Sequence, residues 1–306
     1  MAVPRTTSHE SRIMGLKHIP VLVEEVMMLL RCEPGRTYVD ATLGGGGHAS
    51  EILKRTAPDG VVVGIEWDEE ALSEAKSVLV SFGERAKIYR ENFVRLPELM
   101  KSESVDGILL DLGLSSLQVD KEERGFSFKG DGPLDMRMDQ RMDQTAGDLV
   151  NCLSLAELED TLFHYGEERW SRKIARAIVR ERAQEPITTT QGLRRIVHRA
   201  IPQRFHFRRI DPATKTFQAF RIRVNDELEN LRKILKSGWG ILKKGGRMCV
   251  ISFHSLEDRM VKETCRKLER EGEVRILTRK PVMPSDQERK RNPRSRSAKL
   301  RCAERI

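Results

Sequence analysis

A short apolar strand that runs into four consecutive glycines places the strongest constraint on the fold of this chain. Residues 38–40 lead through Ala-Thr-Leu to Gly44-Gly-Gly-Gly47, and a helical pattern begins near His48. Glycine has no Cβ atom, so this turn can adopt positive φ and lie against a ligand, while the free N–H groups of the helix face the same point. The next apolar segment, residues 61–65, ends at Glu66, whose carboxylate can accept both hydroxyls of a ribose. The pattern predicts a βαβ unit that binds a ligand built on a nucleoside.

The glycines alone do not decide which nucleoside is bound. Gly44-x-Gly46-x-x-Ala49 satisfies the dinucleotide fingerprint, which is a weak signal by itself. Asp40 stands four residues before Gly44, and the resulting Asp-x-Thr-x-Gly-x-Gly segment resembles the first motif of class I S-adenosylmethionine-dependent methyltransferases. A dinucleotide needs its pyrophosphate at the helix N-terminus, whereas S-adenosylmethionine has no phosphate and suits a nearby acid. The segment therefore favours S-adenosylmethionine over a dinucleotide or a glycine turn without a ligand.

Strand and helix patterns alternate along the chain and are interrupted once. Strands are predicted at residues 37–42, 61–66, 86–90 and 105–111, and the alternation resumes with a helix at 226–243 and a strand at 247–253. Continuous apolar strands between helices predict a parallel sheet covered on both faces. We therefore expect an α/β fold, with a doubly wound, class I methyltransferase-like sheet formed by residues 1–116 and 217–306. Residues 117–216 contain only loops and amphipathic helices, and we expect them to form an all-helical insertion that recognises the substrate.

Positive charge is concentrated in two segments. Residues 169–223 contain 15 lysines and arginines against 3 acids, and residues 279–306 contain 10 against 3. The segments carry net charges of +12 and +7, so the remainder carries −10 in a chain of net charge +9. This segregation favours a docking surface for a polyanion over an evenly solvated, arginine-rich helical surface.

Composition argues against several other classes of protein. No apolar run approaches the ~18 residues that a membrane span needs, and the N-terminal segment contains no secretory apolar stretch. We therefore expect a cytoplasmic enzyme without a membrane partner. The five cysteines are widely spaced, with no Cys-x-x-Cys pair, so reduced thiols are expected and neither a zinc site nor disulfides. No other metal motif is present in the sequence, and no metal site is predicted.

Longer motifs follow one another in a single order from about residue 17 to the C-terminus. They are His18-Ile-Pro-Val-Leu22, Gly45-Gly-Gly-His48, Asp111-Leu-Gly-Leu-Ser-Ser116, Arg124-Gly-Phe-Ser-Phe128, Pro133-Leu-Asp-Met-Arg-Met-Asp139, Tyr165-Gly-Glu-Glu168, Lys215-Thr-Phe-Gln-Ala-Phe-Arg-Ile222, Ile251-Ser-Phe-His-Ser-Leu-Glu-Asp-Arg259 and Asn292-Pro-Arg-Ser-Arg-Ser297. The set resembles the RsmH (MraW) family, bacterial enzymes that methylate N4 of a cytosine in the decoding region of 16S ribosomal RNA. The alternatives are a DNA amino methyltransferase and an oxidoreductase or non-catalytic RNA-binding relative of the fold.

The resemblance implies S-adenosylmethionine as cofactor and a set of residues that contact it. These residues are Gly46, Gly47, His48, Glu66, Phe93, Asp111 and Gln118. Glu66 stands where such enzymes more often have aspartate, and the extra methylene keeps the chemistry of the carboxylate. Asp68 is the less favoured substitute, because the chain is already leaving the strand there.

Asp111 is the candidate catalytic residue, because it stands where amino methyltransferases carry Asp/Asn-Pro-Pro-aromatic. This chain has Asp-Leu-Gly-Leu instead, and Leu114 cannot stack on a base. Stacking is then expected from another aromatic ring, with four candidates: Phe126, Phe128, Phe253 and His254. The segment His254-Ser-Leu-Glu-Asp258 is interpreted as a helix capping box, with Ser255 as the N-cap and Asp258 reaching back, and not as part of a hydrolase triad.

The implied substrate is small-subunit ribosomal RNA, within the assembled or nearly assembled subunit, and a homodimer is left open. Five basic residues are expected to contact phosphates flanking the target base: Lys215, Arg221, Arg223, Arg294 and Arg296. For Arg221 and Arg223, pairing with acids of the sheet domain is an equal alternative. Phe217 and Phe220 are expected to be core residues of a helix.

Overall fold

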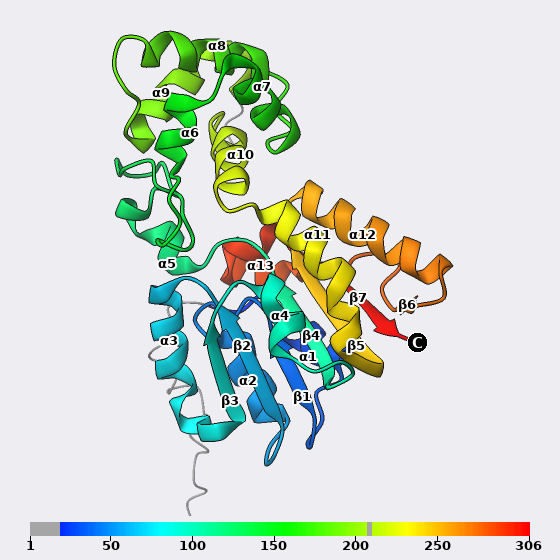
Figure 1. Ribbon diagram of the computed structural model, residues 1–306. Helices are drawn as coiled ribbons and strands as arrows, with labels where there is room; N and C mark the ends of the chain where they lie inside the picture. The colour runs from blue at the N-terminus through cyan, green and yellow to red at the C-terminus, as the bar shows by residue number, and fades with distance from the viewer. Residues whose placement is uncertain (1–18, 207–209) are drawn as a thin grey trace, which may run out of the picture.

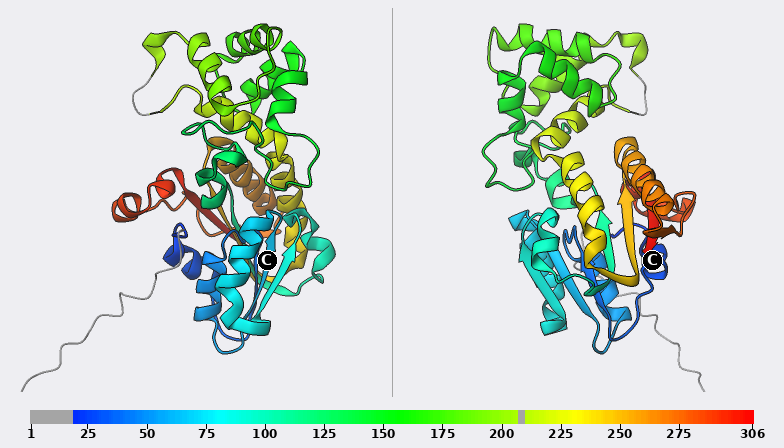
Figure 2. Two further views of the ribbon diagram at one scale, coloured as in Figure 1. Left: turned by 90° about the vertical axis from the view of Figure 1, so that its left-hand side faces the viewer. Right: turned by 45° about the vertical axis from the view of Figure 1, so that its right-hand side comes forward.

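The computed structural model describes residues 19–206 and 210–306, and His18 of the first long motif lies outside them. The chain forms two units, a sheet covered by helices and a helical unit that stands at one end of the sheet (Figures 1 and 2). No helix within the described residues has the length and apolar character needed to cross a membrane.

The sheet contains seven strands in the order β3-β2-β1-β4-β5-β7-β6. The strands are β1 (Thr37–Asp40), β2 (Val61–Glu66), β3 (Ala86–Arg90), β4 (Val105–Asp111), β5 (Leu242–Ser252), β6 (Val274–Ile276) and β7 (Lys299–Arg305). The first five run parallel, and β7 lies antiparallel between β5 and β6. The predicted α/β, doubly wound, methyltransferase-like sheet is confirmed.

Helices cover both faces of the sheet, as the continuous apolar strands predict. They are α1 (Val23–Leu30), α2 (Gly47–Arg55), α3 (Glu69–Leu79), α4 (Leu96–Leu99), α11 (Glu227–Ser237) and α12 (Ser255–Arg270). Tyr38 packs into the core beneath α1, α2 and α3, whereas its neighbour Val39 packs into the core beneath α11 and α12. Adjacent residues of a strand point to opposite faces, so a strand buried on both faces needs apolar residues at every position.

The second half of the sheet departs from the predicted boundaries. Helix α11 ends at Ser237, a 3-10 turn covers Gly238–Ile241, and β5 begins at Leu242. The Lys-Lys-Gly-Gly segment expected to form a turn before the strand therefore lies inside β5. It forms an irregularity there: Val105 pairs with Leu242, but Gly107 already pairs with Arg247, and Gly245 has a φ of 77°. The extra residues bulge out of the ladder between these two pairings.

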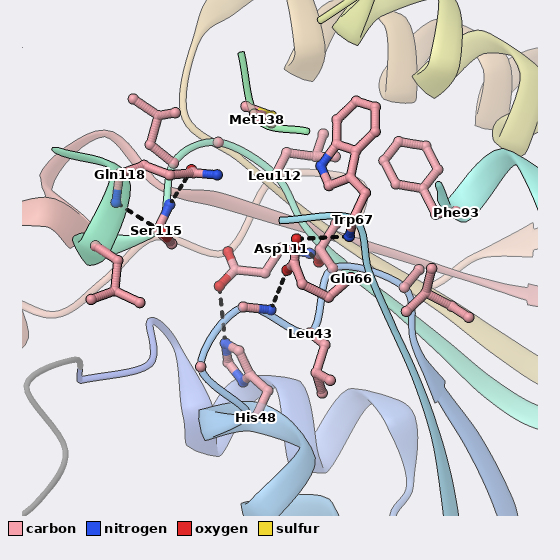
Figure 3. Close-up of a pocket in the computed structure, with 18 of the residues that line it drawn as sticks. Leu43, His48, Glu66, Trp67, Phe93, Asp111, Leu112, Ser115, Gln118 and Met138 are labelled. Atoms are coloured by element: carbon pink, nitrogen blue, oxygen red, sulfur yellow. Dashed lines mark hydrogen bonds and ion pairs between the residues drawn. The ribbon is translucent and has the colours of Figure 1, made fainter. Parts of the chain in front are cut away.

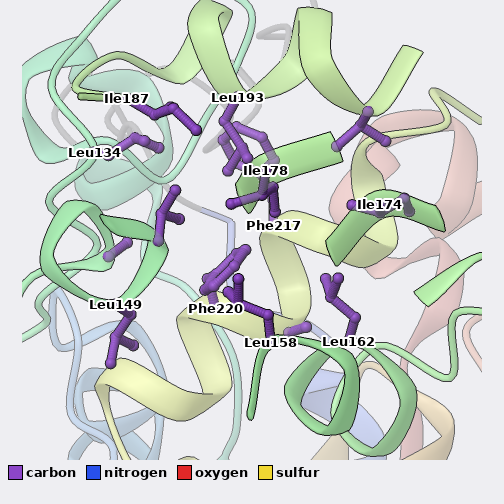
Figure 4. Close-up of a cluster of buried hydrophobic side chains, with 14 of the residues drawn as sticks. Leu134, Leu149, Leu158, Leu162, Ile174, Ile178, Ile187, Leu193, Phe217 and Phe220 are labelled. Atoms are coloured by element: carbon purple, nitrogen blue, oxygen red, sulfur yellow. The ribbon is translucent and has the colours of Figure 1, made fainter. Parts of the chain in front are cut away.

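The helical unit follows β4 and consists of short amphipathic helices around their own core. The helices are α6 (Ala146–Cys152), α7 (Leu155–His164), α8 (Ser171–Arg182), α9 (Thr190–Ala200) and α10 (Thr214–Val224), whereas no described side chain of the short helix α5 (Ser116–Asp120) belongs to this core. Figure 4 shows Leu158, Leu162, Ile174 and Ile178 from α7 and α8 converging on the aromatic residues of α10. This core is separate from the two cores that flank the sheet.

Helix α10 packs with the helical unit, although the sequence analysis assigned residues from 217 onward to the sheet domain. Phe217 and Phe220 are almost fully buried in the helical core, as expected of core residues, and the ring centroid of Phe217 lies 4.8 Å from that of Phe128. The packing boundary therefore follows Val224, whose side chain also belongs to this core. The prediction missed it because the aromatic spacing of α10 does not indicate which core receives the rings.

Candidate cofactor and active site

A cavity of about 360 Å³ opens beyond the carboxyl ends of β1, β2 and β4. The strand order changes direction between β1 and β4, and ligands of doubly wound sheets bind at this point. Residues from the loops after all three strands line the cavity, together with residues of α11 and of the segment after β5 (Figure 3).

The glycine loop forms one wall of the cavity by backbone geometry. Gly44 and Gly46 have φ values of 51° and 83°, which favour glycine. A Cβ atom on Gly47 would lie 2.5 Å from Cγ of Pro20, so only glycine lets α2 begin so close to the N-terminal segment. Gly47 and His48 line the cavity, whereas Gly46 supplies the left-handed turn that precedes α2.

Glu66 ends β2 and lines the cavity, where it is held by backbone groups alone. Its Oε2 accepts a hydrogen bond from Gly44 N–H at 2.8 Å, and its Oε1 accepts from the N–H groups of Trp67 and Asp68 at 3.0 and 2.9 Å. Burial raises the pKa of Glu66 to about 7, although these donors act in the opposite direction. The carboxylate is thus fixed beside the glycine loop, at the place where a ribose would present its hydroxyls.

Asp68, the alternative ribose ligand, faces away from the cavity into a buried ion pair. It caps α3, and its Oδ2 accepts from Gln118 Nε2 at 2.8 Å and from Arg124 Nη2 at 2.7 Å. Asp68 and Arg124 are each 2% exposed, and the same guanidinium nitrogen donates to the carbonyls of Arg137 and Met138. This contact, which we call the Arg124 tie, joins the helical unit to the strand end that carries Glu66.

Asp111 ends β4 and faces His48 across the cavity. Its backbone N–H donates to Thr42 Oγ1 at 2.6 Å, which ties the end of β4 to the first loop. Its Oδ2 lies 3.4 Å from His48 Nε2, and its buried Oδ1 has no hydrogen-bond partner among the described residues. Burial alone would lower the pKa of His48, but the contact with Asp111 and the charges of Asp111 and Asp40 outweigh it and raise this pKa. Asp111 therefore offers an unsatisfied oxygen to a donor or a cation.

Asp40 lies beneath the glycine loop with no exposed surface. Burial raises its pKa to about 6, while the charge of His48 acts in the opposite direction. The sequence motif predicted that Asp40 lies beside the methionine part of the cofactor. In the structure Asp111 lines the cavity, and the negative charge of Asp40 helps to raise the pKa of His48.

Aromatic and amide side chains complete the cavity on the side of Glu66. Phe93, which follows β3, lines it as predicted, and so does the indole of Trp67, which the sequence analysis did not single out (Figure 3). Gln118 also lines the cavity, but both ends of its amide are engaged: Nε2 donates to Asp68, and Oε1 accepts from Ser115 N–H at 3.0 Å. In this arrangement, the hydrogen bonds of Gln118 hold the wall in place, and they use only one of the two Nε2 hydrogens.

Residues of α11 and of the segment after β5 also line the cavity, and among the four named next the sequence analysis offered only Phe253 as a site candidate. Glu227 and Asn230 of α11 line it with Phe253 and Glu257. Arg221 holds Glu227 through two hydrogen bonds of 2.8 Å. Glu227 and Glu257, together with His254, offer ligand atoms within 4.8 Å of one another, a spacing that would suit a metal ion. Arg221 already compensates Glu227, so the group is interpreted here as an ion-pair network.

The capping box before α12 is shifted by one residue from the prediction. His254 is the N-cap and Glu257 reaches back, accepting from the N–H groups of Phe253 and His254. Asp258, predicted for that role, accepts instead from Arg301 Nε at 2.6 Å. The pairs Ser255–Asp258 and His254–Glu257 have the same spacing in sequence. Strand β7 supplies the arginine that engages Asp258, and Glu257 is left to complete the capping box.

The candidate stacking rings are separated by the fold. Phe253 lines the cavity, and a Cβ atom on Gly113 would lie 3.2 Å from its ring. Phe126 and Phe128 instead belong to the core of the helical unit. Of the aromatic rings of Phe126, Phe128 and Phe253, only that of Phe253 faces the cavity.

The five basic residues expected to contact RNA have different partners in the structure. Lys215 Nζ donates to the carbonyl of Glu167 at 2.7 Å, and Arg223 donates to Thr161 Oγ1 at 2.7 Å. Arg221 pairs with an acid of the sheet unit, one of the two alternatives that the sequence left open. Arg294 and Arg296 are both exposed, and Arg294 also lines the cavity and pairs with Asp120. RNA contact by these residues stays a prediction.

Comparison with known proteins identifies the family of the chain. Residues 15–306 match the model of the MraW methylase family. Proteins named ribosomal RNA small subunit methyltransferase H from Syntrophobacter fumaroxidans and Desulfotalea psychrophila are 48% and 51% identical, over 95% and 94% of this chain and 97% and 98% of theirs. A solved S-adenosylmethionine-dependent O-methyltransferase from Thermotoga maritima is 13% identical with a TM-score of 0.42, over 96% of this chain and 69% of that chain. With this family match over nearly its whole length, the chain belongs to the MraW methylase family.

Proposed function

We propose that the protein transfers the methyl group of S-adenosylmethionine to N4 of a cytosine in the decoding region of small-subunit ribosomal RNA. The observation that carries the proposal is the unsatisfied oxygen of Asp111, which faces a cavity bounded by the glycine loop and Glu66. The names of the relatives support ribosomal RNA as the substrate. The RsmH-like motifs support cytosine N4 as the acceptor.

The cavity suits the two ends of S-adenosylmethionine. Glu66 would hold the ribose hydroxyls, and Phe93 and Trp67 offer apolar surface to adenine. Asp111 lies beside the glycine loop, where its unpaired oxygen matches a positively charged group. The bound cofactor supplies an electrophilic methyl group on its sulfonium. The residues present therefore fit the cofactor that the family uses.

The acceptor nitrogen of cytosine is a poor nucleophile, because its lone pair is delocalised into the ring. A carboxylate that accepts a hydrogen bond from the amine concentrates electron density on nitrogen. With Oδ1 of Asp111 given to the positive group of the cofactor, Oδ2, which lies 3.4 Å from His48 Nε2, is the oxygen for this role. Phe253 offers a ring on which the base can stack. The remaining task is alignment of nitrogen and methyl group, which a rigid pocket performs by positioning.

The helical unit supplies a surface suited to single-stranded RNA. Trp170 and Phe205 lie with ring centroids 5.2 Å apart, and both rings are partly exposed. Three cations rest on these rings: Arg169 on both, Lys173 on Trp170 and Arg204 on Phe205. We call these five residues the Trp170 platform. Bases stack on exposed aromatic rings while nearby cations neutralise phosphates, a combination that binds flexible strands and loops.

The proposal is tested by transferring a tritiated methyl group to small ribosomal subunits and to the naked RNA, followed by nucleoside analysis. The expected product is N4-methylcytidine from wild-type protein and almost none from Asp111→Asn. Label in another nucleoside would reject the proposed acceptor. Transfer to DNA cytosine with equal efficiency would reject ribosomal RNA as the specific substrate.

A further inference from the structure

The C-terminal segment reaches the methionine side of the cofactor cavity. Asn292 Nδ2 donates to the carbonyl of Ile19 at 2.9 Å, and Glu288 Oε1 accepts from Leu22 N–H at 2.8 Å. Pro20, between these two contacts, is the residue that a Cβ atom on Gly47 would strike. The segment is therefore fastened to the same wall as the glycine loop, and Arg294, two residues after Asn292, lines the cavity there.

Three side chains that can carry positive charge line the cavity within the described part of the chain: His48, Lys121 and Arg294. His48 contacts Asp111, and Lys121 Nζ donates to Glu70 on the α3 side at 2.7 Å. Arg294 is held by a weaker interaction. Its Nη2 donates to Asp120 at 2.8 Å, but the two side chains are 38% and 67% exposed, and exposed pairs contribute little free energy.

S-adenosylmethionine carries an amino acid with two opposite charges. The unsatisfied oxygen of Asp111 can receive the ammonium group, which leaves the carboxylate in need of a cation at the glycine-loop end of the cavity. A guanidinium binds a carboxylate through two parallel hydrogen bonds and is better suited to this role than a lysine. Arg294 is the guanidinium at this end, and only an exposed ion pair with Asp120 holds it.

We propose that Arg294 leaves Asp120 and binds the carboxylate of the methionine part of S-adenosylmethionine. The C-terminal segment then belongs to the cofactor site, and Arg294 is a cofactor ligand and not a contact for RNA phosphate. The inference rests on the proposed assignment of this cavity to S-adenosylmethionine.

The test measures dissociation constants by calorimetry for S-adenosylmethionine and for its decarboxylated analogue, which keeps the sulfonium and the ammonium. Arg294→Gln is expected to weaken binding of S-adenosylmethionine about ten- to a hundredfold and to leave binding of the analogue unchanged. Arg294→Lys, which keeps the charge but loses the paired geometry, should fall between wild type and Arg294→Gln. Arg296→Gln is the matched control, because Arg296 lies two residues on and outside the cavity, and it should bind both ligands as wild type does.

Three results would overturn the inference. Equal weakening for both ligands in Arg294→Gln would assign the residue a structural role, which a lowered unfolding temperature would accompany. Unchanged binding of S-adenosylmethionine would remove Arg294 from the site. Equal weakening in Arg296→Gln would indicate an unspecific effect of positive charge. Failure of the wild-type protein to bind S-adenosylmethionine at all is a different outcome, because it would reject the assignment of the cavity itself.

Discussion

The sheet unit and the helical unit hold their functional side chains in different ways. At the end of β2, three backbone N–H groups hold the Glu66 carboxylate, and at the end of β4 a hydrogen bond from the Asp111 backbone N–H to Thr42 Oγ1 fixes the strand end that carries Asp111. On the Trp170 platform, long cationic side chains rest on aromatic rings. A small ligand requires carboxylates placed to a fraction of an ångström, whereas an RNA strand requires charge and stacking surface at approximate positions.

The largest expected effect falls on the rigid site. Asp111→Asn keeps the size of the side chain and removes the charge that accepts the amine proton. Methyl transfer at saturating cofactor and RNA should fall about a hundredfold or more. Single-turnover rates with small subunits measure it, and Asp160→Asn, on the exposed side of α7, is the control that should retain the wild-type rate. A rate within threefold of wild type would show that Asp111 positions the cofactor without taking part in the transfer.

The next prediction asks whether the two units unfold independently. Phe220→Ala removes a ring with 0% exposure from the helical core and should lower the free energy of unfolding by about 3–5 kcal/mol. The Arg124 tie joins the two units, so we expect them to unfold together in urea. The fluorescence of Trp170 in the helical unit and that of Trp239 in the sheet unit should then show the same unfolding transition. Phe163→Ala, at a site that is 56% exposed, serves as the control with a small effect. Two separate transitions would show that the units differ in stability as well as in function.

Glu66 gives the sheet unit a specific dependence on pH. Its pKa is about 7 in the folded protein against an ordinary value of 4.5, so the folded state binds the proton more tightly than the unfolded state. The free energy of unfolding should therefore decrease as pH rises from about 5 to 7, by on the order of 1–3 kcal/mol. His48 acts in the same direction because its pKa is also raised. The contribution of Glu66 is therefore the part of the pH dependence of the unfolding free energy that disappears in Glu66→Gln. Equal slopes in urea titrations of both proteins would contradict the prediction.

The smallest expected effects lie on the Trp170 platform. Trp170→Ala should weaken RNA binding by about 1–3 kcal/mol without changing its salt dependence, because stacking releases no counterions. Replacement of Arg169, Lys173 and Arg204 by glutamine should instead flatten the log–log salt slope by about two to three. Binding titrations at several salt concentrations separate these contributions. An unchanged slope would place the phosphate contacts elsewhere, for which exposed Arg296 is the first candidate.

Sequence alone predicted the parts of the molecule that local patterns determine. The strand ends at Glu66 and Asp111, the glycine loop and the helical character of the insertion each follow from a short pattern of residue types. Trp67, Asn230 and Glu257 were missed because their place in the cavity depends on contacts between segments far apart in sequence. The place of Arg294 at the cavity was missed for the same reason, because only the fold brings the C-terminal segment there; its expected contact with RNA stays a prediction.

The Arg124 tie limits how far the helical unit can be treated as a module. Asp68 is buried two residues after Glu66, and its charge is compensated by a guanidinium from the other unit. Deleting or exchanging the insertion would leave that carboxylate unpaired inside the protein, which typically costs about 3–5 kcal/mol. A chimera that receives a foreign helical unit must therefore keep Arg124 or supply an arginine at the same position, because otherwise the sheet unit carries this cost. The graft point for redesign lies after the arginine and not at the end of β4.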